Sequence, residues 1–384
     1  LSNKGIEGVD VHTFHSFGFQ IIKEMEPKAP NILFTEHKYA KNEFFQNEFK
    51  RLLIHEYSFQ NNLIHYFAYY LNEIERDDEF SDLNEYAEHQ FAGGLQTLDG
   101  NYVKSKQEVA IGNFLYLHNI DYEYEKDYKI KTASKYHRQY QPDFYLTKYD
   151  IWLEHFAISK DNNGNETSIF GQRYMQDYKW KIKTHKTHGT NLLSTFSYQF
   201  YNNTIIQELK EMLENNSVVL KMRSQEAIIK DLKTNYKVPL YKFTELISTF
   251  ISLSKSAGIN PETLLSEQIK SSNNRNKLFL EILLPIYKAY QKELKDNKGI
   301  DFDDMISNAV KYLKNNDWQV KYKYLVIDEF QDIGIGRFNL IKEVKKQNPL
   351  ARTFCVGDDW QAIYRFAGGD VSILFNFEKY FGEH

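Results

Sequence analysis

Two short apolar runs in the last sixth of the chain differ from the helical pattern that precedes them. Residues 324–327 (YLVI) stop at Asp328 and Glu329, and residues 353–356 (TFCV) are followed by a glycine and Asp358. Continuous apolar runs of this length are typical of strands buried on both faces of a parallel sheet. We therefore predict two neighbouring strands, separated by a helix, whose acidic residues lie at the carboxyl edge where α/β sheets bind ligands.

Elsewhere the apolar spacing predicts helices around a small mixed module. Residues 9–25 change from alternation to helical spacing, which indicates a strand running into a helix. Residues 36–88 and 202–294 have the spacing of amphipathic helices, and we expect Pro285 to interrupt the last of these. The α/β module between them is expected to contain a helix at 104–118, strands at 122–128, 142–146 and 151–158, a helix at 172–185 and a strand at 191–196.

Composition limits the class of protein without defining it. The 384 residues are 42% hydrophobic and 16% aromatic, which suffices for two or three domains with buried cores. The net charge is -4, so affinity for nucleic acid must come from local basic surface. The most basic stretch contains Lys179 and Lys183, which can neutralise phosphates, and Trp180, which can stack on a base. A solvated helix face is an equally good interpretation of this stretch.

The single cysteine and the lack of long apolar segments predict a soluble, cytoplasmic protein. Cys355 is the single cysteine, so the chain has neither an internal disulfide nor a cysteine zinc site. No segment approaches the roughly 18 consecutive apolar residues that span a bilayer, and the first residues lack a signal-peptide pattern. His12 and His15 have the spacing of a metal pair but no third ligand nearby, so we interpret them as ordinary hydrogen-bonding histidines.

The ends of the two predicted strands carry recognisable motifs. DEFQD at 328–332 and GDDWQAIYRF at 357–366 resemble motifs II and III of the UvrD/Rep-like superfamily 1 DNA helicases. The resemblance implies a site for ATP and Mg²⁺ in which Asp328 binds the metal and Glu329 polarises the attacking water. It also implies that Gln331 and Gln361 sense the γ-phosphate and that Asp358 contacts the nucleotide.

Other segments of the chain resemble the DNA-contacting parts of the same family. TFHS at 13–16 implies that Thr13, His15 and Ser16 contact the phosphates of single-stranded DNA, and motif III implies that Tyr364 and Phe366 stack on bases. The chain departs from the family at Ala367, where an arginine is usual. DFDDM at 301–305 resembles the DFDDL segment that marks the return to the ATPase core, and its first aspartate is also expected to cap a helix.

The module at 104–198 resembles the PD-(D/E)xK nuclease fold, because Pro142-Asp143 and Glu154 fall on successive predicted strands. With Glu108, these carboxylates form a candidate second metal site. Phe156 stands where the fold has its lysine, and Lys179 or Lys183 on the next helix are candidates to replace it. A similar insert occurs in helicase IV-like members, and we favour an inactive module used for DNA contact or structure over a live nuclease.

Together these resemblances imply an α/β fold. A partial RecA-like parallel-sheet core (1A) at residues 1–24 and 295–384 is interrupted by a large helical 1B region at 25–294 that contains the module. No G-x-x-x-x-G-K-[ST] loop and no second RecA-like half occur in the sequence, so we expect an internal piece of a larger helicase that does not turn over ATP alone.

We expect the intact protein to couple ATP hydrolysis to movement along single-stranded DNA and to unwinding of duplex DNA, in repair or recombination. Two alternatives remain open. One is a metal-dependent DNA nuclease centred on Asp143 and Glu154. The other is a DNA-binding remnant without catalysis.

Overall fold

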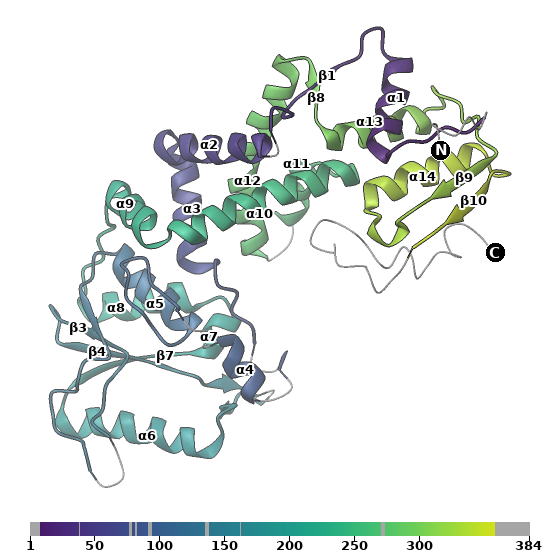
Figure 1. The fold of residues 1–384 in the computed structure, drawn as a ribbon. Coiled ribbons are helices and arrows are strands. Elements are labelled where there is room, and N and C mark those ends of the chain that lie inside the picture. Colours follow the sequence, from purple (N-terminus) through teal and green to yellow (C-terminus); the bar gives the residue numbers. More distant parts are fainter. Residues whose placement is uncertain are drawn as a thin grey trace. The chain divides into compact units, whose positions relative to one another are not determined.

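The structure is a computed structural model, and it describes residues 8–37, 39–76, 79–80, 83–90, 94–134, 138–161, 163–269 and 273–357. The fold is mixed α/β, with small sheets among many helices (Figure 1). The chain divides into two compact units: Leu1–Phe59 with Tyr241–His384 (unit 1), and Gln60–Leu240 (unit 2). Within the described ranges, no helix is long and apolar enough to cross a membrane.

Unit 1 contains helices and two pairs of parallel strands. Its elements are α1 (Phe14–Met25), β1 (Asn31–Ile32), α2 (Ala40–His55), α11 (Pro261–Gln268), α12 (Asn274–Asp296), β8 (Gly299–Ile300), α13 (Phe302–Lys314), β9 (Tyr324–Ile327), a 3₁₀ turn (Phe330–Asp332), α14 (Ile335–Gln347) and β10 (Arg352–Cys355). Two further helices, α3 (Tyr57–Tyr69) and α10 (Lys237–Ala257), pass from one unit into the other along the chain.

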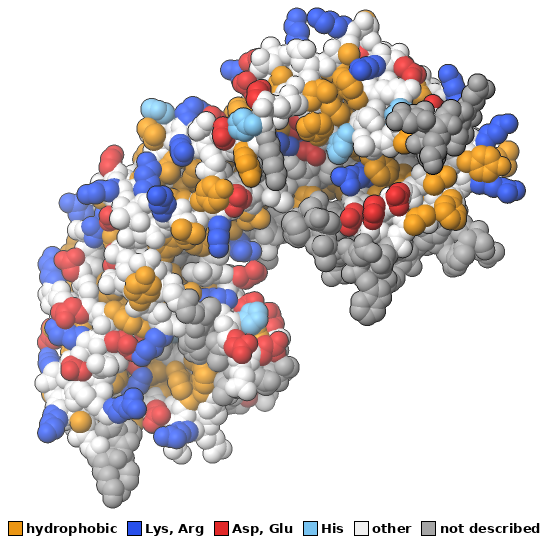
Figure 2. All heavy atoms as spheres, viewed as in Figure 1, with side chains coloured by type: hydrophobic (Ala, Val, Ile, Leu, Met, Phe, Trp, Pro, Cys, Tyr) orange, Lys and Arg blue, Asp and Glu red, His pale blue; other side chains and the backbone are white. Residues whose placement is uncertain are grey.

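The predicted pair of strands near the carboxyl end is confirmed. Strands β9 and β10 run parallel, with Tyr324 opposite Arg352 and Ile327 opposite Cys355, and α14 connects them. The prediction that both faces are buried is wrong: Tyr324, Val326 and Phe354 are 68%, 74% and 65% exposed. One face of this strand pair is covered by side chains from α14. The opposite face is exposed, and Figure 2 shows apolar side chains at the surface over β9 and β10.

Two local predictions in unit 1 are also wrong. Residues 9–13 form no strand, because no described strand lies beside them to accept their backbone hydrogen bonds, and α1 begins directly at Phe14. Pro285 lies inside a continuous α12. The lost backbone hydrogen bond is outweighed by burial along one face of the helix, which includes Leu283, Ile286 and Tyr290.

Unit 2 contains a four-stranded sheet between helices, in the predicted order of elements. Its elements are α4 (Leu83–Gln90), α5 (Lys106–Leu117), β2 (Tyr122–Tyr124), β3 (Phe144–Leu146), β4 (Ile151–Phe156), β5 (Ser159–Lys160), β6 (Glu166–Thr167), α6 (Gly171–His188), β7 (Asn191–Phe196), α7 (Ser197–Tyr201), α8 (Ile205–Asn215) and α9 (Gln225–Asn235). The sheet order is β2-β3-β4-β7, with β7 parallel to β4 and the other pairs antiparallel.

Two layers of helices enclose this sheet. Apolar side chains of α5 and α8, among them Phe114 and Leu209, pack with Phe144 and Leu153 on one face. Helix α6 covers the other face, where Trp180 packs against an aromatic cluster that includes Trp152 (Figure 1). The sheet therefore presents successive residues of β4 alternately to α5 and to α6.

Candidate functional sites

The first candidate site lies at the carboxyl end of β9. Asp328 and Glu329 are exposed, and the Glu329 N–H donates to Asp328 Oδ1 at 3.0 Å. Glu329 adopts a left-handed backbone conformation (φ 52°), which is rare for residues other than glycine and clusters at functional sites. Gln331 is buried behind it and donates from Nε2 to Glu329 Oε2 at 2.6 Å. The turn thus presents two carboxylates to solvent from a fixed backbone.

The start of the second motif packs against this turn. The Phe330 N–H donates to Val356 O at 2.9 Å, and the Val356 N–H donates to Ile327 O at 2.9 Å. A Cβ on Gly357 would lie 2.7 Å from Gln331 Oε1, so a larger residue here would displace the Gln331 side chain. Asp358, Gln361, Tyr364, Phe366 and Ala367 lie outside the described residues, and their assignments stay predictions.

The TFHS segment lies close to the same turn. The ring of Phe14 packs against the apolar cluster of β9 and the 3₁₀ turn, and Thr13 caps α1 by accepting the Ser16 N–H at 3.1 Å. Arg337 connects the two segments, because its guanidinium lies 6.0 Å from the centre of the Phe14 ring and donates to Asp332 O at 3.4 Å. The structure therefore brings three of the sequence-predicted segments together: TFHS, DEFQD and the first residue of GDDWQ.

His15 in this segment is an aromatic neighbour of α13. Its ring lies edge-on to Phe302, with the two ring centres 5.6 Å apart. Burial and the positive charge of Arg337 lower the pKa of His15, and this outweighs the opposite effect of Asp303 and Asp301. The imidazole is therefore neutral at pH 7, and it can act toward a phosphate only as a hydrogen-bond partner.

A buried charged cluster surrounds the start of α13. The predicted cap is confirmed: Asp301 accepts the Asp304 N–H at 2.8 Å, and Asp304 accepts the Asp301 N–H at 3.2 Å. The sequence gives no sign of its partners, Lys41 and Lys255, whose ammonium groups lie 3.1 and 3.0 Å from Asp301 Oδ2. Burial alone would raise the pKa of Asp301, but the two lysines and the Tyr290 hydroxyl lower it far below its usual range.

The second candidate site is a cavity of about 290 Å³ in unit 2, lined by residues from α5, β4 and α6 and by Asp143, which precedes β3. Glu154 on β4 is 0% exposed beside it. Its Oε2 accepts from the Tyr140 hydroxyl at 3.0 Å and from the Asp143 N–H at 3.3 Å, and its Oε1 bonds to Lys181. These three partners, all from unit 2, hold the Glu154 carboxylate in place.

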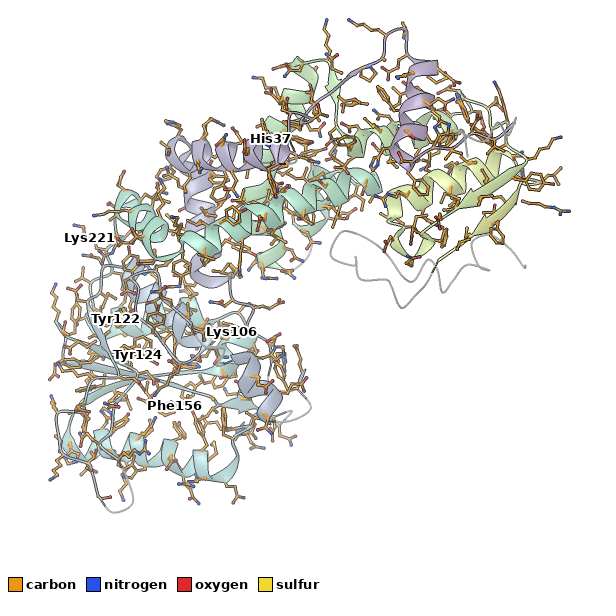
Figure 3. The ribbon with its side chains drawn as sticks, in the orientation of Figure 1. His37, Lys106, Tyr122, Tyr124, Phe156 and Lys221 are labelled. Atoms are coloured by element: carbon orange, nitrogen blue, oxygen red, sulfur yellow. The ribbon has the colours of Figure 1, made fainter. Side chains whose placement is uncertain are left out.

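Asp143 and Glu108 complete the acidic lining of the cavity. Asp143 Oδ2 accepts the His155 N–H at 2.6 Å, and burial together with the charges of Glu154 and Glu108 raises the pKa of Asp143 well above its usual value. Glu108 is held by Ser105 and by Tyr124 of β2, which Figure 3 labels. No three His, Cys, Asp or Glu side chains in the described part of the chain form a group that could hold a metal ion, so the three-carboxylate site stays a prediction.

The lysine beside Glu154 is one that sequence reasoning missed. Lys179 and Lys183 are exposed on α6, whereas Lys181 turns inward, and Phe156 (labelled in Figure 3) lies with its ring centre 5.6 Å from the Lys181 ammonium. A signal was present, since Tyr174, Tyr178, Lys181 and His185 follow the 4-3-4 spacing of one helix face. Trp180 packs against the aromatic cluster of unit 2, so its contact with DNA stays a prediction.

These sites define a class of protein before any comparison: an α/β protein with polar side chains at the carboxyl ends of parallel strands, where this class binds its ligands. The family described as the UvrD/REP helicase N-terminal domain matches residues 162–382, which is more than half of the chain. The chain belongs to this family.

Similar proteins carry helicase names. DNA helicase IV of Escherichia coli is 38% identical over 104 residues, which cover 27% of this chain and 15% of that protein. DNA helicase II of Rickettsia typhi is 32% identical over 184 residues, 46% of this chain and 27% of that protein. ATP-dependent DNA helicase PcrA of Staphylococcus epidermidis is 26% identical over 177 residues, 44% of this chain and 23% of that protein. The matches thus span about a sixth to a quarter of these relatives.

Proposed function

We propose that this chain is part of an ATP-dependent DNA helicase of the cytoplasm that moves along single-stranded DNA and unwinds duplex DNA in repair or recombination. The observation that carries the proposal is the carboxyl edge of β9, where Asp328 and Glu329 are exposed in a chain of the UvrD/REP family. The names of the relatives, which include ATP-dependent DNA helicases, supply the reaction class.

The residues at this edge fit Mg²⁺ and a nucleotide. Asp328 is an exposed carboxylate at the end of a parallel strand, and hard oxygen ligands of this kind suit Mg²⁺. When bound, ATP with Mg²⁺ would supply a phosphoanhydride bond whose hydrolysis releases free energy. In this proposal Asp328 holds the metal, Glu329 orients and deprotonates the attacking water, and Gln331 fixes the Glu329 carboxylate through its 2.6 Å hydrogen bond.

Coupling to DNA is proposed to pass through the packing between the motifs. Thr13 and Ser16 lie at the amino end of α1, where backbone N–H groups and the helix dipole favour phosphate. Phe14 of this segment packs against the turn that carries Glu329. A change at the nucleotide edge therefore acts directly on the helix that would hold the DNA backbone.

The finer description of the fold belongs to the same proposal. We assign residues 1–24 and 295–384 to a RecA-like 1A core, residues 25–294 to a 1B region, and residues 104–198 to a PD-(D/E)xK-like insert. Support comes from the parallel pairing of β9 with β10 and from the sheet order β2-β3-β4-β7, with helices on both faces, in unit 2.

The test uses the intact open reading frame that encodes these residues. In the intact protein, Glu329→Gln should lower kcat for DNA-stimulated ATP hydrolysis at least about 100-fold while single-stranded DNA affinity is retained. Asp317→Asn, an exposed loop substitution, serves as the control. An intact protein whose ATP hydrolysis is unaffected by Glu329→Gln would refute the assignment.

A further inference from the structure

Arg337 in unit 1 lies between two segments that the proposed function assigns to different ligands. It belongs to the first turn of α14, and both α14 and α1 pack against α13 (Figure 1). Its guanidinium donates to the backbone oxygen of Asp332 in the DEFQD turn, and it lies 6.0 Å from the centre of the Phe14 ring in the TFHS segment. One cation therefore contacts both the proposed nucleotide segment and the proposed DNA segment.

The surroundings of this guanidinium leave its charge uncompensated. Arg337 is half-buried, and its bond to Asp332 is long, at 3.4 Å, and goes to the backbone instead of the carboxylate. Among the described residues it has no other hydrogen bond and no ion pair, although a guanidinium has five N–H donors. A partly buried charge without a partner is unfavourable. The structure thus contains a cation that a bound anion would stabilise.

The position of Arg337 along its helix increases this effect. Helix α14 begins at Ile335, so Arg337 lies where the first backbone N–H groups have no partner within the helix and the helix dipole is positive. The first turn contains no acidic residue, and Gly334 at the cap has no side chain that could accept from these N–H groups. Positive charge therefore accumulates at this end of α14.

The TFHS segment places neutral polar groups beside this charge. Burial and the charge of Arg337 lower the pKa of His15, so the guanidinium lies within electrostatic reach of an uncharged imidazole. The carboxylates of Asp303 and Asp301 also reach His15, but both are paired with Lys41 and do not compensate Arg337. Since the segment itself is neutral, Arg337 is the group that can supply the positive charge for a phosphate.

We propose that Arg337 is the cation of a phosphate-binding site for the backbone of single-stranded DNA, which it forms together with His15 and the amino end of α1. The choice of DNA as the source of the phosphate rests on the proposed function. The planar fork of a guanidinium donates two parallel hydrogen bonds to a phosphate, whereas the ammonium of a lysine acts as a point charge. Arginine at this position therefore fixes the phosphate in orientation as well as in place.

The test measures DNA binding by the intact protein without nucleotide, so that the result does not depend on ATP hydrolysis. Fluorescence anisotropy of a labelled thymidine oligonucleotide gives the dissociation constant at several salt concentrations. Arg337→Gln should weaken binding about 10-fold or more, because hydrogen bonds between charged groups are lost. The slope of log affinity against log salt concentration should become about 0.7 less steep, which corresponds to one phosphate contact on a single strand.

Two variants separate the loss of this contact from other effects. Lys342→Gln removes an exposed charge from the same helix and should change neither the affinity nor the slope. Arg337→Lys retains the charge, so it should keep the slope and lose part of the affinity with the second hydrogen bond. Should Arg337→Gln fail to fold, Arg337→Lys decides the matter, because an affinity equal to that of the unmodified protein would exclude the site.

The outcomes also separate the two sources of phosphate. The site is overturned if Arg337→Gln binds DNA like Lys342→Gln, or if the unmodified protein does not bind the oligonucleotide. Arg337→Gln should leave KM for ATP unchanged at saturating DNA. A raised KM with unchanged DNA binding would assign the guanidinium to the nucleotide and overturn the site as well. None of these results alters the effect of Glu329→Gln on ATP hydrolysis, which tests the proposed function separately.

Discussion

The substitution Lys255→Met tests whether the buried charged cluster at the start of α13 stabilises unit 1. The Lys255 ammonium lies 3.0 Å from Asp301 Oδ2 and 2.9 Å from Asp304 Oδ2, and its side chain is only 5% exposed. Methionine retains most of the apolar stem of Lys255 and removes only the charge. The substitution therefore leaves the buried carboxylates of Asp301 and Asp304 with one fewer cation.

The expected loss of stability follows from this geometry. Removing one partner of a buried ion pair costs about 3–5 kcal/mol, because the other charge stays buried without compensation. Lys41 remains 3.1 Å from Asp301, so we expect the lower end, about 3 kcal/mol. Since a domain of this size loses about 2–4 °C per kcal/mol, the melting temperature should fall by about 6–12 °C.

The pH dependence of stability provides a second measurement on the same variant. Burial and the neighbouring charge of Asp301 already raise the pKa of Asp304, and Lys255 opposes them. Without Lys255 the pKa of Asp304 rises further, so the folded variant takes up a proton that the unfolded chain does not. Its stability should therefore increase, relative to the unmodified chain, as the pH falls from 7 to 5.

The assay is thermal or urea unfolding of the 384-residue chain at pH 7 and pH 5. Lys242→Met, which changes an exposed lysine on the same helix α10, is the control. Equal melting temperatures for Lys255→Met and Lys242→Met at pH 7 would refute the reasoning. So would a difference between them that grows when the pH is lowered.

Three further predictions follow from contacts of the described residues. Gly18→Ala should destabilise unit 1 by about 1–3 kcal/mol in urea unfolding, because its Cβ would lie 2.5 Å from Met305 O on α13. Burial lowers the pKa of His155 to about 3, so only the unfolded chain gains its proton below pH 6.5; stability should fall by about 1.4 kcal/mol per pH unit there, and less in His155→Gln. The slope of log affinity for single-stranded DNA against log salt concentration should become about 1.4 less steep when both Lys179 and Lys183 are replaced by alanine. Lys230→Ala, at an exposed position on α9, should leave this slope unchanged.

Local patterns in the sequence determined most elements and the first candidate site. Strands β9 and β10 were predictable because a short apolar run has a high strand propensity, and acidic residues directly after it are typical of the edge of a sheet. The cap at Asp301 was predictable for the same reason, since its hydrogen bonds reach only three residues along the chain. The order of elements in unit 2 followed from the alternation of two hydrophobic periods, 2 and 3.6 residues.

Only the tertiary structure decided which charged groups meet. Lys181, instead of Lys179 or Lys183, contacts Glu154 because the packing of α6 on the sheet selects one face of that helix. Lys41 and Asp301 are 260 positions apart, and no local pattern encodes such a pair. Pro285 stays helical because the burial of one face of α12 outweighs the local cost of a proline. Residues 9–13 form no strand because no described strand lies beside them, which their local pattern does not reveal.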